Sequence, residues 1–259
     1  KRLEAELGVT LVTRNTRQLA LTDAGERFYL RCLRTLDEAR LAIEEARSEH
    51  SQLKGTLRIT TTVEYALAKV VPALELFRQQ HPQLHIHLST SSTHADLIGE
   101  RFDLAIRLGR LLDSNLRAVQ LATFDVFAVA APALLARHGA VTGLAALQHL
   151  PTLGHGRVPH LSVTDPQGVE HDYQPQAGQV AVVADNSATL RAFAMAGHGV
   201  AILPQWLVQA DLDAGHLQHL LPDHRFTRQG VYALYPNTRH LPLKVRAFID
   251  FLKLREGGG

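Results

Sequence analysis

The sequence predicts an α/β protein in which a two-lobed domain follows a small hairpin and a long helix. Three observations lead to this prediction. Strand-like and helix-like segments alternate from residue 54 onward, helical periodicity runs without Pro or Gly over residues 26–54, and two short β-prone runs precede it. We therefore expect three parts, over residues 1–21, 22–53 and 54–256.

The first part reads as the end of a helix followed by a hairpin with a basic tip. Gly8 supplies a left-handed stop after Leu7. Two β-prone runs follow, and Arg14 and Arg17 belong to the polar turn between them. A helix that leads into such a hairpin is how a winged helix-turn-helix ends, with its wing along a DNA phosphate backbone. An ordinary surface hairpin is the alternative.

Residues 22–53 are expected to form one long helix. Asp23 and Glu26 stand three residues apart, as in a capping box. A narrow, mostly apolar stripe follows a 4,3,4,3 spacing. Its members are Tyr29, Leu33, Leu36, Arg40 and Ile43, with Cys32, Ala39 and Ala46 beside them. Because a single stripe needs a partner, we expect a dimerising linker helix and a homodimer or homotetramer; packing on its own domain is the alternative.

The third part alternates strands and helices. We expect strands at 57–61, 84–89, 104–108, 124–130, 180–184, 200–203 and 231–235, a hairpin turn at 165–168, and helices at 65–80, 95–101, 132–138, 187–196 and 243–254. Such alternation predicts mainly parallel sheets. Two lobes with a cleft between them are expected, one of about residues 55–122 and 231–256 and the other of about 123–230.

Composition and charge narrow the class of protein. With 259 residues, 46% of them hydrophobic, the chain can bury a sizeable core and is not a disordered tail. Its single cysteine, Cys32, fits a reducing compartment, and no apolar run or leader points to a membrane, so we expect a soluble cytoplasmic protein. The net charge of +2 implies no polyanion partner by itself, but residues 1–21 are locally basic, which favours a nucleic-acid contact there.

Several segments of the chain resemble the landmarks of one known family. They lie at residues 3–9, 19–27, 55–59, 102–109, 196–204 and 235–248. Together they resemble the LysR-type transcriptional regulators: the first two resemble the end of that family's recognition helix and its wing-to-linker junction, and the other four resemble landmarks of its effector domain, in the right order. The resemblance covers essentially the whole chain.

This resemblance implies a fold, a partner and a ligand. The fold is a winged helix-turn-helix, a linker helix and a periplasmic-binding-protein-like domain whose two lobes hold a small effector. DNA is the implied partner of the N-terminal part. The first helices and most of the recognition helix have no counterpart before Lys1, so a missing upstream segment is expected. Arg14 and Arg17 are carried over only as phosphate contacts, which position a protein without reading sequence.

Candidate effector contacts lie where strands lead into helices, because free backbone N–H groups and short hydroxyl side chains there can hold a polar ligand. They are Thr61, Thr62, Glu64, Ser92, Thr93, Arg107 and Asn186. Helix capping without a ligand is the alternative for Thr62, Thr93 and Asn186. Since Glu64 lies in the first turn of a helix that would otherwise attract an anion, we expect a small polar effector that need not be a carboxylate.

The motifs of the common enzyme classes are missing from the sequence. It contains no nucleophile elbow, no phosphate-binding glycine loop and no paired metal-ligand helix, so no catalytic residue, cofactor or metal is expected. Gly197 and Gly199 are interpreted as parts of a tight turn. His85 and His87 are interpreted as exposed or hydrogen-bonded imidazoles. A solute-binding receptor is the other function open to a two-lobed cleft, although it has no use for residues 1–53.

Overall fold

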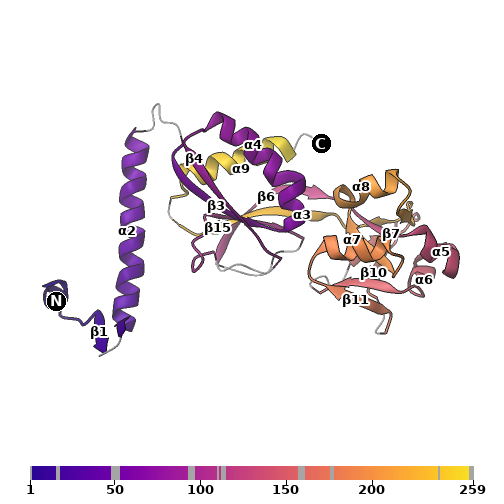
Figure 1. Ribbon diagram of the computed structural model, residues 1–259, viewed down its shortest axis with the longest axis horizontal. Coiled ribbons are helices and arrows are strands. Elements are labelled where there is room, and N and C mark those ends of the chain that lie inside the picture. Colours follow the sequence, from indigo (N-terminus) through magenta and orange to yellow (C-terminus); the bar gives the residue numbers. More distant parts are fainter. Residues whose placement is uncertain are drawn as a thin grey trace. The chain divides into compact units, whose positions relative to one another are not determined.

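A computed structural model describes residues 2–15, 18–47, 53–92, 97–109, 111, 115–156, 161–175, 178–238 and 240–256. The chain divides into two compact units, and Figure 1 labels many of their helices and strands. The first comprises Lys1–Gln52 with Thr238–Pro242, and the second comprises Leu53–Asn237 with Leu243–Gly259. In the described part of the chain, no helix is long and apolar enough to cross a membrane.

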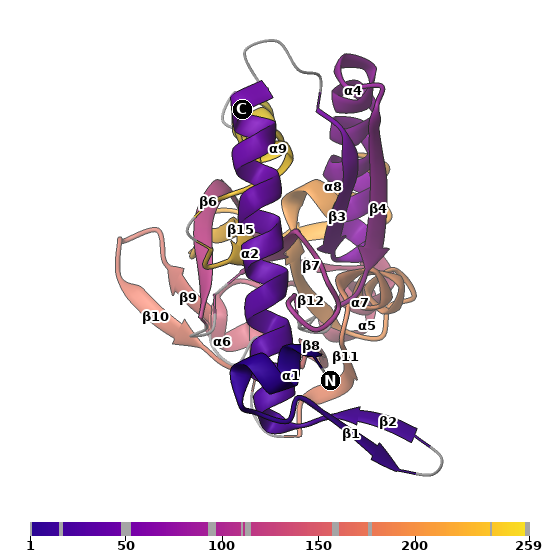
Figure 2. The same cartoon turned by 90° about the vertical axis from the view of Figure 1, so that its left-hand side faces the viewer.

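The first unit contains the predicted hairpin and long helix, which can be followed in Figure 2. Helix α1 (Arg2–Leu7) leads to strands β1 (Val12–Asn15) and β2 (Gln18–Leu21), and then to α2 (Asp23–Arg47). The strands pair antiparallel. The Glu4 carboxylate fastens α1 to the hairpin by accepting from the backbone N–H groups of Leu11, at 2.9 Å, and Val12, at 3.1 Å. The hydrogen bond from the Leu11 N–H contributes most to lowering the pKa of the Glu4 carboxyl below its ordinary value, and the Val12 N–H adds to the effect.

The junction between the hairpin and α2 depends on a glycine. The Thr22 hydroxyl donates to the Thr10 carbonyl at 2.7 Å and accepts from the Gly25 N–H at 2.9 Å. A Cβ at Gly25 would lie 1.9 Å from the Leu11 carbonyl oxygen, so a larger residue would push the start of α2 away from the backbone that directly precedes β1. The prediction that Asp23 and Glu26 form a capping box is therefore wrong. Thr22 is the capping residue, because its hydroxyl accepts from the Gly25 N–H.

The first lobe of the second unit is built on a five-stranded sheet in the order β4-β3-β5-β15-β6. Its strands are β3 (Gly55–Thr61), β4 (Leu84–Thr90), β5 (Leu104–Leu108), β6 (Leu116–Phe124) and β15 (Gln229–Pro236). Its helical elements are α3 (Val63–Tyr65), the π-helical η1 (Ala66–Val70), α4 (Val71–Gln80) and α9 (Leu243–Glu256). Phe77 of α4 packs against Phe248 of α9 with ring centroids 5.1 Å apart, which joins the two longest helices of the lobe.

The second lobe is built on another five-stranded sheet, in the order β11-β8-β12-β7-β13. Its strands are β7 (Val126–Ala130), β8 (Thr152–His155), β11 (Val180–Ala184), β12 (Val200–Pro204) and β13 (Gln218–Leu220). Its helices are α5 (Pro132–His138), α6 (Leu144–Leu147), α7 (Ser187–Met195) and α8 (Gln205–Asp213). A small antiparallel sheet adds β9 (Leu161–Thr164), β10 (Glu170–Tyr173) and β14 (Arg225–Phe226).

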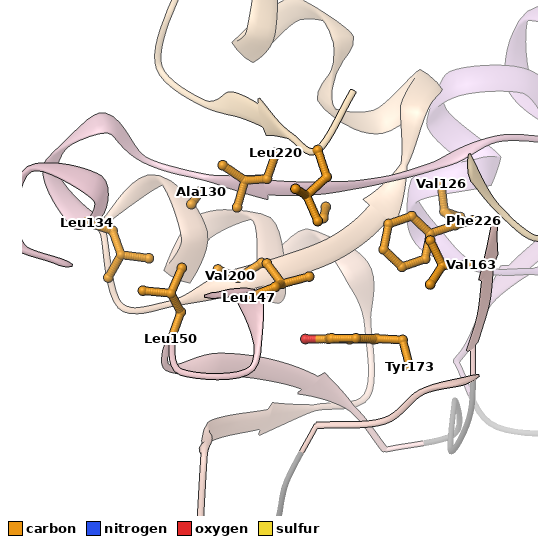
Figure 3. Packing of buried hydrophobic residues seen from close by; sticks show 12 residues of the cluster. Val126, Ala130, Leu134, Leu147, Leu150, Val163, Tyr173, Val200, Leu220 and Phe226 are labelled. Carbon is orange, nitrogen blue, oxygen red and sulfur yellow. The ribbon is translucent and has the colours of Figure 1, made fainter. Parts of the chain in front are cut away.

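Side chains of the central strand β12 alternate between two apolar clusters, one on each face of the sheet. Val200 belongs to the cluster of Leu134, Leu147, Tyr173 and Phe226, which Figure 3 shows from close by. Ala201 and Leu203 belong to the opposite cluster, which includes Leu153, Leu190 and Val208. The sheet is thus covered on both faces, as a strand that is apolar at consecutive positions requires.

The structure corrects three expectations about the strands and helices. Neither five-stranded sheet is mainly parallel. In the first sheet, β3 runs parallel to β4 and β5, but β15 runs antiparallel to β5 and β6. In the second sheet, β8 runs parallel to β11 and β12, but β7 runs antiparallel to β12 and β13. The reason is that β6 leaves the first lobe and β15 returns to it from Gln229, so the two strands point in opposite directions. The sequence pattern missed β6, and residues 97–101 form a turn where a helix was expected.

The turn at 197–199 has the structural role that was predicted for it. Gly197 has a φ of +74°, and a Cβ at Gly199 would lie 2.7 Å from the carbonyl oxygen of Pro151. That same carbonyl accepts from the N–H of Val200 at 2.8 Å. Gly199 therefore lets β12 begin directly beside the loop that precedes β8.

Candidate functional site

Polar contacts between the two lobes meet at the first turn of α7. The backbone N–H of Ala188 donates to Oε1 of Glu64 at 2.8 Å. Glu64 comes from α3 of the first lobe, and it is only 7% exposed. The N–H of Thr189 donates to Oδ1 of Asn186 at 2.8 Å. Two N–H groups that lack partners within a helix are thereby satisfied, and the partial positive charge of the helix start favours the carboxylate.

A second contact between the lobes lies beside the first. Oγ of Ser92, which follows β4, donates to Oδ2 of Asp185 at 3.1 Å. Nδ2 of Asn186 donates to the other oxygen of Asp185, also at 3.1 Å. Two carboxylates, Glu64 and Asp185, therefore lie at the start of α7. The sequence places Ser92 and Asn186 among the candidates, and the structure brings them together through Asp185.

An aromatic contact joins the lobes as well. Trp206, in the first turn of α8, lies edge-on to Tyr65 of α3 with ring centroids 5.6 Å apart, and to Phe124 of β6 at 6.2 Å. The Trp206 indole N–H is buried without a hydrogen-bond partner. Burial raises the pKa of the Tyr65 phenol, and the Glu256 carboxylate adds to the effect, so the phenol stays protonated at neutral pH.

A further set of polar side chains lies where β3 and β5 end: Arg107 of β5 and the threonines at the end of β3. Arg107 is 7% exposed, and its Nη2 donates to Oγ1 of the fully buried Thr60 at 3.3 Å. Thr61 is also fully buried, and its hydroxyl has no hydrogen-bond partner. Thr62 occupies the N-cap position of α3 in an extended conformation, but its side chain makes no capping hydrogen bond.

Helix capping was the alternative to effector contact for Thr62, Thr93 and Asn186, and the structure shows it for only one of the two that it describes. Asn186 does cap α7, and Thr62 does not cap α3. Thr93 and Arg17 lie outside the described residues. Arg14 lies in β1, where it is paired with Leu19 of β2.

Histidines show no sign of a metal centre in the part of the chain that the structure describes. No group of three or more His, Cys, Asp or Glu side chains there is placed to hold a metal ion. Nδ1 of His87 lies 3.1 Å from the guanidinium of Arg58. His219 stacks on Phe127 with ring centroids 4.0 Å apart, and burial lowers its pKa.

The comparisons with known proteins decide the family. Residues 50–255 match the family described as the LysR substrate binding domain. The chain is 34% identical to the HTH-type transcriptional regulator PtxR of Pseudomonas aeruginosa, over 98% of the chain and 81% of PtxR. The chain belongs to the LysR family of transcription regulators.

Solved structures of other LysR-type regulators have the same fold. CrgA of Neisseria meningitidis gives a TM-score of 0.68 at 31% identity, covering 99% of this chain and 87% of CrgA. The virulence activator AphB of Vibrio cholerae gives a TM-score of 0.66 at 29% identity, covering 97% of this chain and 86% of AphB. The resemblance seen in the sequence and the two-lobed periplasmic-binding-like fold are thus confirmed, and the relatives are named as regulators of transcription.

Proposed function

We propose that this LysR-type regulator senses a small polar metabolite between its two lobes and transmits the signal to DNA in the cytoplasm as an oligomer. The observation that carries the proposal is the meeting of polar groups from both lobes at the start of α7, through Glu64 and Ala188. The proposed effector contacts are Thr61, Thr62, Glu64, Ser92, Thr93, Arg107 and Asn186. Thr62 is the first choice as a direct contact, because its hydroxyl does not cap α3.

An aromatic side chain at the contact between the lobes can report on ligand binding. Trp206 is the single tryptophan of the chain, and it contacts aromatic rings of the first lobe. Any ligand that changes the separation of the lobes should change its environment. We expect at least one small polar metabolite, from a panel of amines, amino acids, sugars and acids, to shift the Trp206 emission saturably and to raise the melting temperature, as ligands of a native state do.

The DNA part of the proposal assigns a different role to each of three segments of the chain. We propose that residues 1–21 contact DNA, that residues 22–53 form the dimerising linker and that residues 54–256 bind the effector. The boundary between the two compact units, after Gln52, supports this division. In the hairpin, Arg14 and Arg17 are the proposed phosphate contacts.

Replacing Arg17 with Glu is expected to weaken binding to every DNA duplex to a similar degree, because a phosphate contact carries no sequence information. The slope of log K against log salt should fall by about 1 for each phosphate that the protein no longer neutralises. Fluorescence anisotropy on two duplexes of unrelated sequence measures both quantities. Lys253→Glu, which makes the same change of charge on an exposed position of α9, is the matched control. An equally large weakening of DNA binding in the control variant would show that the effect of Arg17→Glu does not depend on a contact between the hairpin and DNA.

A further inference from the structure

The start of α7 is occupied by acidic groups of the protein itself. Glu64 accepts from the N–H of Ala188, and Asp185 accepts from Ser92 and Asn186. The helix is nine residues long, and Glu64 reaches it from the other lobe with only 7% of its surface exposed. Helix starts attract anions, and a carboxylate already fills this position.

We infer that Glu64 determines the chemical class of the effector: it excludes ligands that would place a carboxylate or phosphate at α7, and it selects ligands that present hydrogen-bond donors such as amines, amides or hydroxyls. This inference rests on the proposed function, because it concerns the same cleft.

Charge and burial both support this role. An incoming anion would have to displace Glu64 from the Ala188 N–H, and it would still face Asp185. Because the Glu64 side chain is almost fully buried, repulsion between like charges there is screened by water much less than at the surface. A ligand with an N–H or O–H group meets two acceptor carboxylates in the same place. Removing the Glu64 carboxylate would free one N–H group and remove one negative charge.

A purely mechanical role for Glu64, as a strut between the lobes, predicts a different result. Glu64→Gln keeps the side-chain length and an oxygen that can accept from Ala188, but it removes the charge. If Glu64 were only a strut, this variant would bind anions no better than the wild type. If its charge excludes anions, Glu64→Gln should bind them better, and Glu64→Ala better still.

The experiment titrates malonate into the 259-residue chain at constant ionic strength, with Trp206 emission as the readout and sodium chloride as the salt control. We expect the dissociation constant for malonate to fall by about tenfold or more in Glu64→Ala relative to the wild type. A smaller fall in the same direction is expected in Glu64→Gln. Glu75→Gln, on an exposed position of α4, is the matched control and should behave as the wild type.

Equal malonate affinity in the wild type and the Glu64 variants, including no binding by any of them, would overturn the inference. Should Glu64→Ala lose its folded circular-dichroism spectrum, the isosteric Glu64→Gln decides the matter. The result is separable from that of the proposed function. A polar metabolite that shifts Trp206 in the wild type keeps the cleft as the effector site even where the Glu64 variants fail to bind malonate.

Discussion

Replacing Arg191 with Ala is expected to lower the free energy of unfolding by about 2–3 kcal/mol. Arg191 of α7 binds Asp211 of α8 with two hydrogen bonds, Nε to Oδ2 at 2.5 Å and Nη2 to Oδ1 at 2.6 Å. Asp211 is only 4% exposed, so the substitution leaves a buried carboxylate without its cation. The expected effect is smaller than that for a fully buried pair, because the Arg191 side chain is 35% exposed and water screens part of the interaction.

An exposed arginine–aspartate pair, Arg228 with Asp125, supplies the control. Nε of Arg228 lies 3.1 Å from Oδ1 of Asp125, and the two side chains are 61% and 47% exposed. Exposed pairs contribute little, so Arg228→Ala is expected to cost less than about 1 kcal/mol. Urea denaturation followed by circular dichroism compares the two variants. Similar destabilisation of both would show that burial of Asp211 is not what makes its ion pair important.

Replacing Leu36 with Asp is expected to dissociate the oligomer that we propose for α2. Tyr29, Leu33 and Leu36 are 43%, 39% and 68% exposed, and they follow the spacing of one face of this 25-residue helix. A contact related by twofold symmetry would lose Leu36 from both copies. At about 1.5 kcal/mol or more for each buried leucine, the dissociation constant of a dimer should rise by about a hundredfold or more.

Light scattering coupled to gel filtration measures this change as a fall in mass toward that of one chain. Leu254→Asp is the matched control, because Leu254 of α9 is 82% exposed and lies outside α2. A mass that stays unchanged in Leu36→Asp, over a range of concentrations, would assign self-association to another surface. The predicted Ile43 contact lies in α2 as well, but the structure does not describe its side chain.

Strands and helices were predictable where the chain carries its own boundary signals. The strand at 180–184 and the helix at 132–138 were placed with the bounds that the structure shows, and Pro132 opens the helix. Strand β6 was missed because only Leu121 among its nine residues is buried, so the sequence shows no alternation. Its place comes from pairing along the whole length of β15, which the local sequence does not encode.

The helix predicted at 65–80 also differs from the structure in a way that the sequence pattern does not show. Its first half is a π-helical turn, η1, which ends two residues before Pro72. Proline has no N–H to donate into the helix, so the regular hydrogen-bond pattern cannot continue through it. The pattern of apolar residues predicted the helix but not this change of pitch.

The sequence predicts positions for candidate site residues, but it does not predict their contacts. Glu64 and Asn186 are candidates because each lies where a strand leads into a helix. The contact between Glu64 and Ala188 spans 124 positions of the sequence, so only the packing of the lobes reveals it. The sequence analysis does not single out Trp206, although a lone tryptophan two residues after a strand, in the first turn of a helix, is a usable signal.

Effector binding between the lobes is tested most directly by one titration, in which the active metabolite from the panel is added to the wild type and to Thr62→Val while Trp206 emission is followed. We expect saturable binding to the wild type, binding weaker by about tenfold in Thr62→Val through removal of one hydrogen bond, and no change in the control Thr123→Val, on an exposed position of β6. No response to any metabolite in the panel, or the same affinity in all three proteins, would contradict an effector site between the lobes.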